Sequence, residues 1–525
     1  MDYTDIKRLT DQNKLMRDKI YARGFYLTND FVDDEAYPFY GCWQLTEWRN
    51  FKLLVHPKQN FHLNETNGRF MCLIGHAYDP FNMASDESVI LKKLNRLFAE
   101  NKSECLEKFN DLTGIFTLIC IEDGKVYLVG DPAGMQTTFY SMKDDKIYIS
   151  SHTKLLGDTL GLSMDPYVKE LVGYKFFRLL GNSLPGDLTP YKRVKRLVPN
   201  HYVLFKQPGV IKIKRFYTPA MLQQSEEELA AEAAEIMHSN LQLIAEKWEK
   251  PAISLTGGCD SKTTLACANG LYDRFGYFSY ISSEAERVDA EAAQNIGKAL
   301  GLRHTIYNIP NRDEEMDGVQ TASDILFWNT GGIRRSNPND VRKRVFFADT
   351  EDFDVEVKSW ASEIGRAYYS KRFHGRKNFG DSPTPRKCTT LYKFFLHNRK
   401  LVRETDEVFA KYLKRYFRQD TEHPVPWQEQ FFWEFRMPSW NGLVITGEHR
   451  YSFDITIPYN NRRLLNILLS APIDARINDS LYKTIRQLMN PAIDNTGISV
   501  TNLLHTEKRE KAENLYYMIH SKLPF

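Results

Sequence analysis

The stretch that decides the fold is ISLTGGCDSKTTLACANG, residues 253–270. Its apolar start, Ile253–Leu255, predicts a strand, and a helix with Leu265 and Ala268 on one face is expected after the turn. Glycines in such a turn let the backbone approach a ligand and direct its N–H groups toward one point, and the helix N-terminus adds partial positive charge. The pattern therefore predicts a strand–loop–helix unit that holds an anion such as pyrophosphate.

Polar side chains in this loop suit a nucleotide and its metal ion. Thr256 and Ser261 supply hydroxyl donors, and Asp260 supplies a hard carboxylate suited to Mg²⁺ rather than to phosphate. The loop is not a Walker loop, because GxxxxGK[ST] is absent. A plain strand-to-helix turn with two glycines is the alternative interpretation. The predicted cofactor-binding residues are Ser254, Leu255, Thr256, Gly257, Gly258, Asp260, Ser261 and Lys262.

Length and composition indicate a globular α/β protein with more than one domain. The 525 residues exceed the roughly 100–200 expected per domain, and hydrophobic and charged contents of 42% and 26% are ordinary for soluble proteins. Residues 20–215 are predicted to be mostly β, with one clear helix at 88–98. A helix at 225–248 then opens the helix–strand alternation of a parallel sheet. The predicted domains are 1–220 and 221–525.

Charge and cysteine usage exclude several classes of protein. A net charge of +3 with dispersed basic residues gives no case for nucleic acid as partner, and the clusters 192–196 and 342–344 are interpreted as solvated faces. Seven scattered cysteines without a CxxC pair predict neither a disulfide framework nor a zinc site. The charged N-terminus and the lack of a run of about 18 apolar residues predict no signal peptide and no membrane span. We therefore expect a cytoplasmic protein.

The loop at 256–261 resembles the SGGxDS pyrophosphate loop of the N-type ATP pyrophosphatases, with Thr256 in place of the first Ser. This resemblance implies adenylation, with ATP and Mg²⁺ as cofactors. Further blocks resemble the asparagine-synthetase family and the core of class II glutamine amidotransferases. They imply an N-terminal αββα sandwich of Ntn-hydrolase type, followed by a parallel-sheet ATP pyrophosphatase domain with extra helices. The blocks are 277–304, 453–472 and 480–489 for the synthetase, and 112–116, 130–134 and 138–140 for the amidotransferase.

The glutaminase nucleophile of that family has no counterpart at the start of this sequence. Such glutaminases use an N-terminal Cys whose free amine acts as base, whereas this chain starts Met1-Asp2-Tyr3. Cys42 is predicted to be an ordinary buried thiol and the first domain to be inactive as a glutaminase. The chain thus resembles β-lactam synthetases and lasso-peptide macrolactam cyclases, in which an amine of the substrate attacks an adenylated carboxylate.

A second acidic loop of the family corresponds to residues 355–366. Trp360 and Ser362 replace both of its glycines, and Glu363 is the nearby acid. Glu363 is predicted to be a metal ligand, together with Asp260, or the base for the amine. An ion pair with Arg366, three residues on, is the alternative.

A cation is needed near the α-phosphate, because negative charge accumulates there in the transition state. The resemblance places a Lys shortly after the C-terminal helix. Lys508 is the best-placed candidate, with Lys483 and Lys511 behind it, and a solvated surface lysine is the alternative for each.

The substrate pocket is expected in the divergent segment 305–450, where core packing is the alternative for the aromatic residues. Residues 371–387 are predicted to form a mobile surface loop, with a substrate lid as the alternative. The candidate pocket residues are Phe327, Trp328, Arg334, Arg335, Tyr392, Trp427 and Trp433.

The predicted function is that of an ATP- and Mg²⁺-dependent ligase that forms an amide and releases AMP and pyrophosphate. Amidation with free ammonia or with a separate glutaminase, and a non-catalytic protein that binds nucleotide or a partner, are the alternatives. The expected partner is a carboxylate-bearing small molecule or peptide with an amine acceptor, without nucleic acid or membrane, and a homodimer is the candidate assembly.

Overall fold

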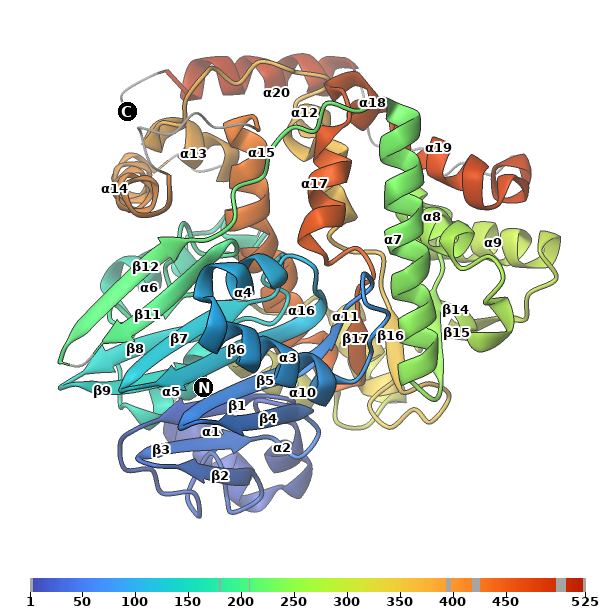
Figure 1. Cartoon of the computed structure of the whole chain (residues 1–525). Helices are drawn as coiled ribbons and strands as arrows, with labels where there is room; N and C mark the ends of the chain where they lie inside the picture. Colours follow the sequence, from blue (N-terminus) through green and yellow to red (C-terminus); the bar gives the residue numbers. More distant parts are fainter. Residues whose placement is uncertain are drawn as a thin grey trace.

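Three β-sheets organise the chain, two antiparallel and one parallel (Figure 1). The computed structural model describes residues 3–178, 181–206, 208–392, 398–417, 425–496 and 507–522. The antiparallel sheets lie at the lower left of Figure 1, and the parallel sheet lies at the right beside a long upright helix. The predicted mixed α/β class is confirmed.

The first antiparallel sheet has the order β10-β8-β9-β1-β3-β2, and its strands come from two separate parts of the first half. Its bounds are β1 (Phe25–Thr28), β2 (Gln44–Trp48), β3 (Phe51–Val55), β8 (Phe139–Lys143), β9 (Lys146–Ser150) and β10 (Lys195–Arg196).

The second antiparallel sheet has the order β12-β11-β7-β6-β5-β4. Leu27 and Leu53 of the first sheet belong to one apolar core with Ile119 and Phe205 of the second, so the two sheets pack against each other. Its strands are β4 (Phe61–Thr66), β5 (Arg69–Tyr78), β6 (Thr113–Glu122), β7 (Lys125–Gly130), β11 (His201–Lys206) and β12 (Val210–Arg215).

Helices in the first half are more numerous than the one clear helix that the sequence predicts between residues 20 and 215. That prediction was wrong because the additional helices there are too short for an apolar period to stand out. Polar caps define two of them: Asn101 accepts hydrogen bonds at the start of α4, and Asp165 does so at the start of α6. The helices are α1 (Tyr3–Gln12), α2 (Lys14–Lys19), α3 (Glu87–Glu100), α4 (Lys102–Lys108), α5 (Thr153–Thr159) and α6 (Pro166–Gly173).

The parallel sheet has the order β15-β14-β13-β16-β17, so the strand order reverses between β13 and β16. A crevice forms at the carboxyl ends of the strands at such a reversal. The long helix before it, α7 (Glu226–Lys247), starts with a capping box formed by Ser225 and Glu228. The strands are β13 (Pro251–Ser254), β14 (Gly276–Ile281), β15 (His304–Asn308), β16 (Val355–Val357) and β17 (Asp454–Thr456).

The remaining helices surround this sheet and fill the upper part of Figure 1. Phe373 and Phe379, within the predicted surface loop at 371–387, are buried and contact Tyr517. Within the described ranges, no helix is both long and apolar enough to span a bilayer. The helices are α8 (Cys259–Cys267), α9 (Glu284–Ala299), α10 (Val319–Asn329), α11 (Pro338–Phe346), α12 (Tyr368–Arg372), α13 (Pro385–Tyr392), α14 (Arg399–Tyr416), α15 (Trp427–Phe431), α16 (Leu443–Gly447), α17 (Arg462–Ser470), α18 (Ile473–Asn478), α19 (Ser480–Met489) and α20 (Glu507–His520).

The segment Asn460–Arg462, just before α17, ties the second half to the first. The Asn460 side chain donates to Oδ1 of Asp131 over 2.9 Å and accepts from the N–H of Ala133 over 2.9 Å. The guanidinium of Arg462 is fully buried and donates to the carbonyl of Gly130 over 3.0 Å. Because these groups have no access to water, each half completes the hydrogen bonding of the other.

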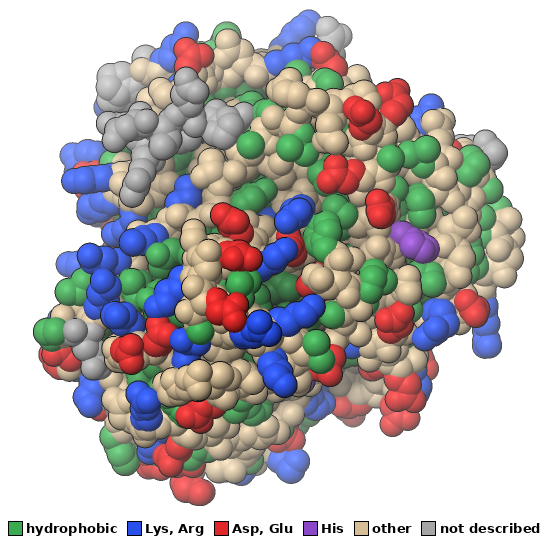
Figure 2. Space-filling view, viewed as in Figure 1, with side chains coloured by type: hydrophobic (Ala, Val, Ile, Leu, Met, Phe, Trp, Pro, Cys, Tyr) green, Lys and Arg blue, Asp and Glu red, His purple; other side chains and the backbone are tan. Residues whose placement is uncertain are grey.

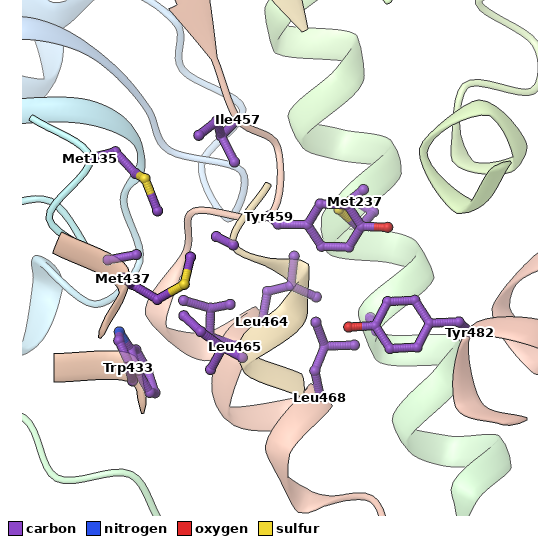
Figure 3. Packing of buried hydrophobic residues seen from close by; sticks show 14 of the residues in the cluster. Met135, Met237, Trp433, Met437, Ile457, Tyr459, Leu464, Leu465, Leu468 and Tyr482 are labelled. Carbon is purple, nitrogen blue, oxygen red and sulfur yellow. The ribbon is translucent and has the colours of Figure 1, made fainter. Parts of the chain in front are cut away.

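The apolar core beside this segment is also shared between the halves. Figure 3 shows Met135 of the first half next to Met437, with Leu464 and Leu465 of α17 close by. These side chains belong to one buried cluster, which continues to the parallel sheet through Ile457. The two halves therefore fold around a continuous core.

The junction yields a stability prediction. Asn460→Ala should lower the free energy of unfolding by about 2–4 kcal/mol, because it removes buried hydrogen bonds to Asp131, to the N–H of Ala133 and to the carbonyl of Gly114. Urea or thermal unfolding measures this loss. Asn308→Ala, at an exposed position on β15, is the matched control and should melt with the wild type. Equal melting of both variants would contradict the role of Asn460.

Candidate functional site

A pocket of about 470 Å³ opens where the strand order of the parallel sheet reverses. It is lined by the loop after β13 and by residues that follow β16, because neighbouring parallel strands deliver their carboxyl ends to the same edge of the sheet. Of the predicted binding residues, Gly257 and Lys262 are not part of the lining. Those that line the pocket are Ser254, Leu255, Thr256, Gly258, Asp260 and Ser261.

The loop after β13 is closed by its own hydroxyl groups. Thr256 Oγ1 and Ser261 Oγ lie 2.9 Å apart, and the N–H of Gly258 donates to Thr256 Oγ1 over 3.1 Å. These two hydroxyls were predicted to be ligand donors, but in the structure they brace the turn that starts α8. Burial raises the pKa of Asp289, and the nearby N–H of Gly257 acts in the opposite direction. A bound anion would compete with that carboxylate for the N–H.

Asp260, in the first turn of α8, is held by partners from distant parts of the chain. Its Oδ1 accepts from the hydroxyl of Ser362 over 2.8 Å, and its Oδ2 pairs with Arg366. Arg366 also pairs with Asp479, with 2.8 Å between Nη2 and Oδ2. Burial raises the pKa of Asp260 in spite of Arg366, which acts in the opposite direction.

Glu363 lines the same pocket and lies close enough to Asp260 for the two carboxylates to repel. Burial, and then the charge of Asp260, raise the pKa of Glu363 to about 7. Its Oε2 is buried with no hydrogen-bond partner. The alternative of an ion pair with Arg366 is wrong, because among the described residues Arg366 pairs with Asp260 and Asp479 instead.

A divalent cation fits these two carboxylates. Two like charges in one buried place are costly unless a cation lies between them, and the partnerless Oε2 of Glu363 is a free ligand atom. The described residues contain no group of three or more His, Cys, Asp and Glu side chains arranged for a metal. Mg²⁺ is commonly held by one or two carboxylates together with substrate phosphates, so Asp260 and Glu363 match that pattern.

The predicted catalytic lysines are Lys483 and Lys508. Lys483 is exposed on α19 and does not contribute to the lining. Lys508 belongs to the backbone of α20, but its side chain lies outside the described residues.

The lysine that the structure brings to the pocket is Lys358, which the sequence prediction missed. It is buried, pairs with Glu356 over 2.6 Å and lies 5.1 Å from the ring of Trp360. It directly follows β16, so its place at the carboxyl end of a strand was the signal that could have identified it.

Basic residues of the predicted solvated cluster 342–344 are buried, so that interpretation was wrong. Arg342 pairs with Asp313 over 2.6 Å, and Arg344 lines the pocket. The cluster 192–196 also ends in a buried residue, Arg196.

Of the candidate pocket residues in segment 305–450, Arg334 alone is part of this lining. The four buried aromatic candidates follow the alternative of core packing. They are Trp328, Tyr392, Trp427 and Trp433.

Cys42 was predicted to be a buried thiol, but it is exposed. It lies in the turn before β2, where its Sγ donates to the carbonyl of Tyr40. The prediction failed because Cys is buried in most proteins, and the sequence around it carries no signal of exposure.

The raised pKa of Glu363 predicts a pH-dependent contribution to stability. Between its ordinary pKa of 4.5 and about 7, the folded protein binds the proton more tightly than the unfolded chain, so the free energy of unfolding falls as the pH rises. Glu363→Gln removes this contribution. Relative to wild type, the variant should gain on the order of 1–3 kcal/mol between pH 5 and pH 8.

Urea unfolding at several pH values, without nucleotide or Mg²⁺, measures this difference. Glu291→Gln, at an exposed position on α9, is the control and should follow the wild-type pH profile. A Glu363→Gln profile parallel to that of wild type would show that Glu363 titrates normally.

Sequence comparison relates the chain distantly to an asparagine synthetase. No protein-family profile matches it. It is 22% identical over 229 residues to asparagine synthetase [glutamine-hydrolyzing] 1 of Bacillus subtilis. The match covers 43% of this chain and spans only 34% of that relative's length.

Two solved structures give weaker matches. The allosteric regulatory enzyme of purine biosynthesis has a TM-score of 0.24 at 10% identity and covers 57% of this chain and 62% of its own. The glutamine phosphoribosylpyrophosphate amidotransferase of B. subtilis, complexed with ADP and GMP, has a TM-score of 0.23 at 11% identity, with coverages of 78% and 90%. TM-scores of this size do not establish a shared fold. The sequence similarity therefore relates part of this chain to an asparagine synthetase at low identity.

Proposed function

We propose that this chain is an ATP- and Mg²⁺-dependent ligase that adenylates a substrate carboxylate and joins it to an amine. The observation that carries the proposal is the pocket at the reversal of strand order, which is lined by both the glycine loop after β13 and the acidic loop after β16. The proposed organisation is an Ntn-hydrolase-like αββα domain, residues 1–220, and an ATP pyrophosphatase domain, residues 221–525.

In this proposal the glycine loop and the N-terminus of α8 hold the pyrophosphate part of ATP. The helix N-terminus offers free N–H groups and partial positive charge. Asp260 and Glu363 hold Mg²⁺, which neutralises the charge of the departing pyrophosphate when bound. Lys358, a buried lysine of the pocket, is proposed to face the α-phosphate in place of the lysines predicted from sequence.

The proposed reaction has two steps. A carboxylate oxygen of the substrate attacks the α-phosphorus, and the bond to the β-phosphate oxygen breaks, so pyrophosphate leaves. The amine then attacks the carbonyl carbon of the acyl-adenylate, AMP leaves, and the amine loses a proton. If Glu363 is not a metal ligand, its pKa of about 7 suits it as the acceptor of that proton. An amine on the same substrate would make the reaction resemble that of β-lactam synthetases or lasso-peptide cyclases.

A specific observation favours a second candidate, a non-catalytic nucleotide-binding protein. Arg366 already pairs with the carboxylate of Asp260, and a metal ion would have to share that carboxylate with the guanidinium. Free ammonia as the nitrogen source is a third candidate, which keeps the chemistry and changes the amine. Isotope exchange between pyrophosphate and ATP separates the catalytic candidates from the non-catalytic one. Dependence of AMP formation on added ammonium then identifies the amine.

The decisive variant is Asp260→Asn. It keeps the size of the side chain but removes the charge that would bind Mg²⁺, so exchange between pyrophosphate and ATP should fall by at least about 100-fold. Asp479→Asn is the matched control, because Asp479 also pairs with Arg366 but does not line the pocket. Its left-handed backbone, with φ of 58°, tolerates Asn.

Asp479→Asn should retain exchange within about tenfold of wild type, since it weakens only the ion pairs with Arg366 and Lys371, which do not line the pocket. Asp260→Asn with wild-type exchange would remove the proposed metal role. A wild-type protein that binds ATP but shows no exchange with any carboxylate tested would favour the non-catalytic candidate.

A further inference from the structure

Arg344, on α11, is a buried cation without a counter-charge. Its side chain lines the pocket, and the residue is only 4% exposed. No hydrogen bond or ion pair among the described residues uses its guanidinium, and its Nη1 is buried without a partner. Cζ of its guanidinium lies 6.0 Å from the centre of the Phe453 ring. A buried guanidinium without an anion is strongly disfavoured. Because none of the described residues supplies that anion, Arg344 is a candidate site for an anion from a ligand.

The neighbouring cations differ from Arg344 in this respect. Arg334 pairs with Glu448, and Lys358 pairs with Glu356. Lys343 pairs with Glu286 and Asp340. Among the residues that the structure describes, each cation of this group except Arg344 therefore has a paired acid.

The group surrounds His449, which also lines the pocket. Burial, followed by the charges of Arg344, Lys358, Lys343 and Arg334, holds the pKa of His449 well below its usual range. His449 is therefore neutral and adds no positive charge, but it does not screen Arg344 either. The four cations of this group and the four acids that pair with three of them are equal in number, so Arg344 is distinguished by its lack of a paired acid and not by an excess of charge.

Shape and surroundings favour a carboxylate over a phosphate at Arg344. The ring of Trp360 lies 5.1 Å from that of His449, and Trp440 and Val444 also line the pocket. Such apolar walls suit the carbon skeleton of an organic acid. A planar guanidinium binds a carboxylate through two parallel hydrogen bonds. The phosphates of ATP have a separate place at the N-terminus of α8 in the proposed function.

We infer that Arg344 is the anion subsite of the pocket and binds a carboxylate group of the second substrate. The inference of an anion subsite rests on the burial of Arg344 and on its lack of a paired acid among the described residues. Only the statement that its ligand is the co-substrate of an adenylating enzyme rests on the proposed function.

Stability of the ligand-free protein gives the first test. Arg344→Met keeps the bulk of the side chain and removes an uncompensated buried charge, so the melting temperature should rise by about 1–2 °C. Arg334→Met is the matched control. It leaves the buried Glu448 without its partner, and the melting temperature should fall by several degrees. A fall of similar size in Arg344→Met would show that Arg344 has a partner within the chain and would overturn the inference.

Ligand binding gives the second test, with succinate, acetate and Mg·ATP as probes. Calorimetric titration of the folded variant should show succinate binding at least about tenfold weaker in Arg344→Met than in wild type, and Mg·ATP binding within about twofold. Acetate, with a single carboxylate and no further contacts, should show the same dependence on Arg344 at lower affinity.

Each other outcome has one meaning. Loss of Mg·ATP affinity in Arg344→Met with succinate unaffected would assign Arg344 to the phosphates and overturn the inference. Carboxylate binding that is absent, or equal in both proteins, would overturn it as well. Arg344-dependent succinate binding in a wild-type protein that neither binds Mg·ATP nor exchanges pyrophosphate would leave the subsite in place and refute the proposed function alone.

Discussion

Parallel pairing of β13 with β16 is the constraint on which the pocket depends. Its register sets Ile253 opposite Val357, so both strands end at the same level and their following loops emerge together. Because β14 lies on the outer side of β13 and β17 on the outer side of β16, the connections leave in opposite directions and do not cover the junction. A slip of one strand would separate Asp260 from Glu363, since each is placed by the turn directly after its strand.

The carboxylates of Asp260 and Glu363 can lie close together because basic side chains lie next to them. Arg366 reaches Asp260 and Asp479 at once, and Lys371 also pairs with Asp479. Arg366 also acts to lower the pKa of Glu363, but burial and the charge of Asp260 outweigh it. Oε2 of Glu363 is buried without a hydrogen-bond partner among the described residues. A cation bound beside it would offset the repulsion between the two carboxylates.

Local sequence patterns predicted the elements better than the site. The helix predicted at 225–248 is α7 (Glu226–Lys247), and the helix predicted at 88–98 lies within α3 (Glu87–Glu100), because periodicity and cap residues are properties of consecutive residues. Side-chain roles depend on partners far along the chain. Nothing near Arg344 in sequence indicates that it is buried, and nothing near Arg366 indicates that it lies against Asp260. The predicted donors Thr256 and Ser261 form a hydrogen bond with each other, because side-chain hydroxyls commonly bond to polar groups nearby in the chain.

The Asn460–Arg462 segment also limits how the chain can be divided. The hydroxyl of Thr456, in β17, lies 3.1 Å from Nε2 of His76 and 3.1 Å from the hydroxyl of Tyr78. Side chains of the first half therefore contact the edge strand of the parallel sheet. A fragment with the second half alone would expose this edge, the guanidinium of Arg462 and a large apolar surface. The first half thus covers buried surface of the second half beside the pocket, a role that needs no catalytic residue. Damage to it would reach the pocket as misfolding and aggregation rather than as altered chemistry.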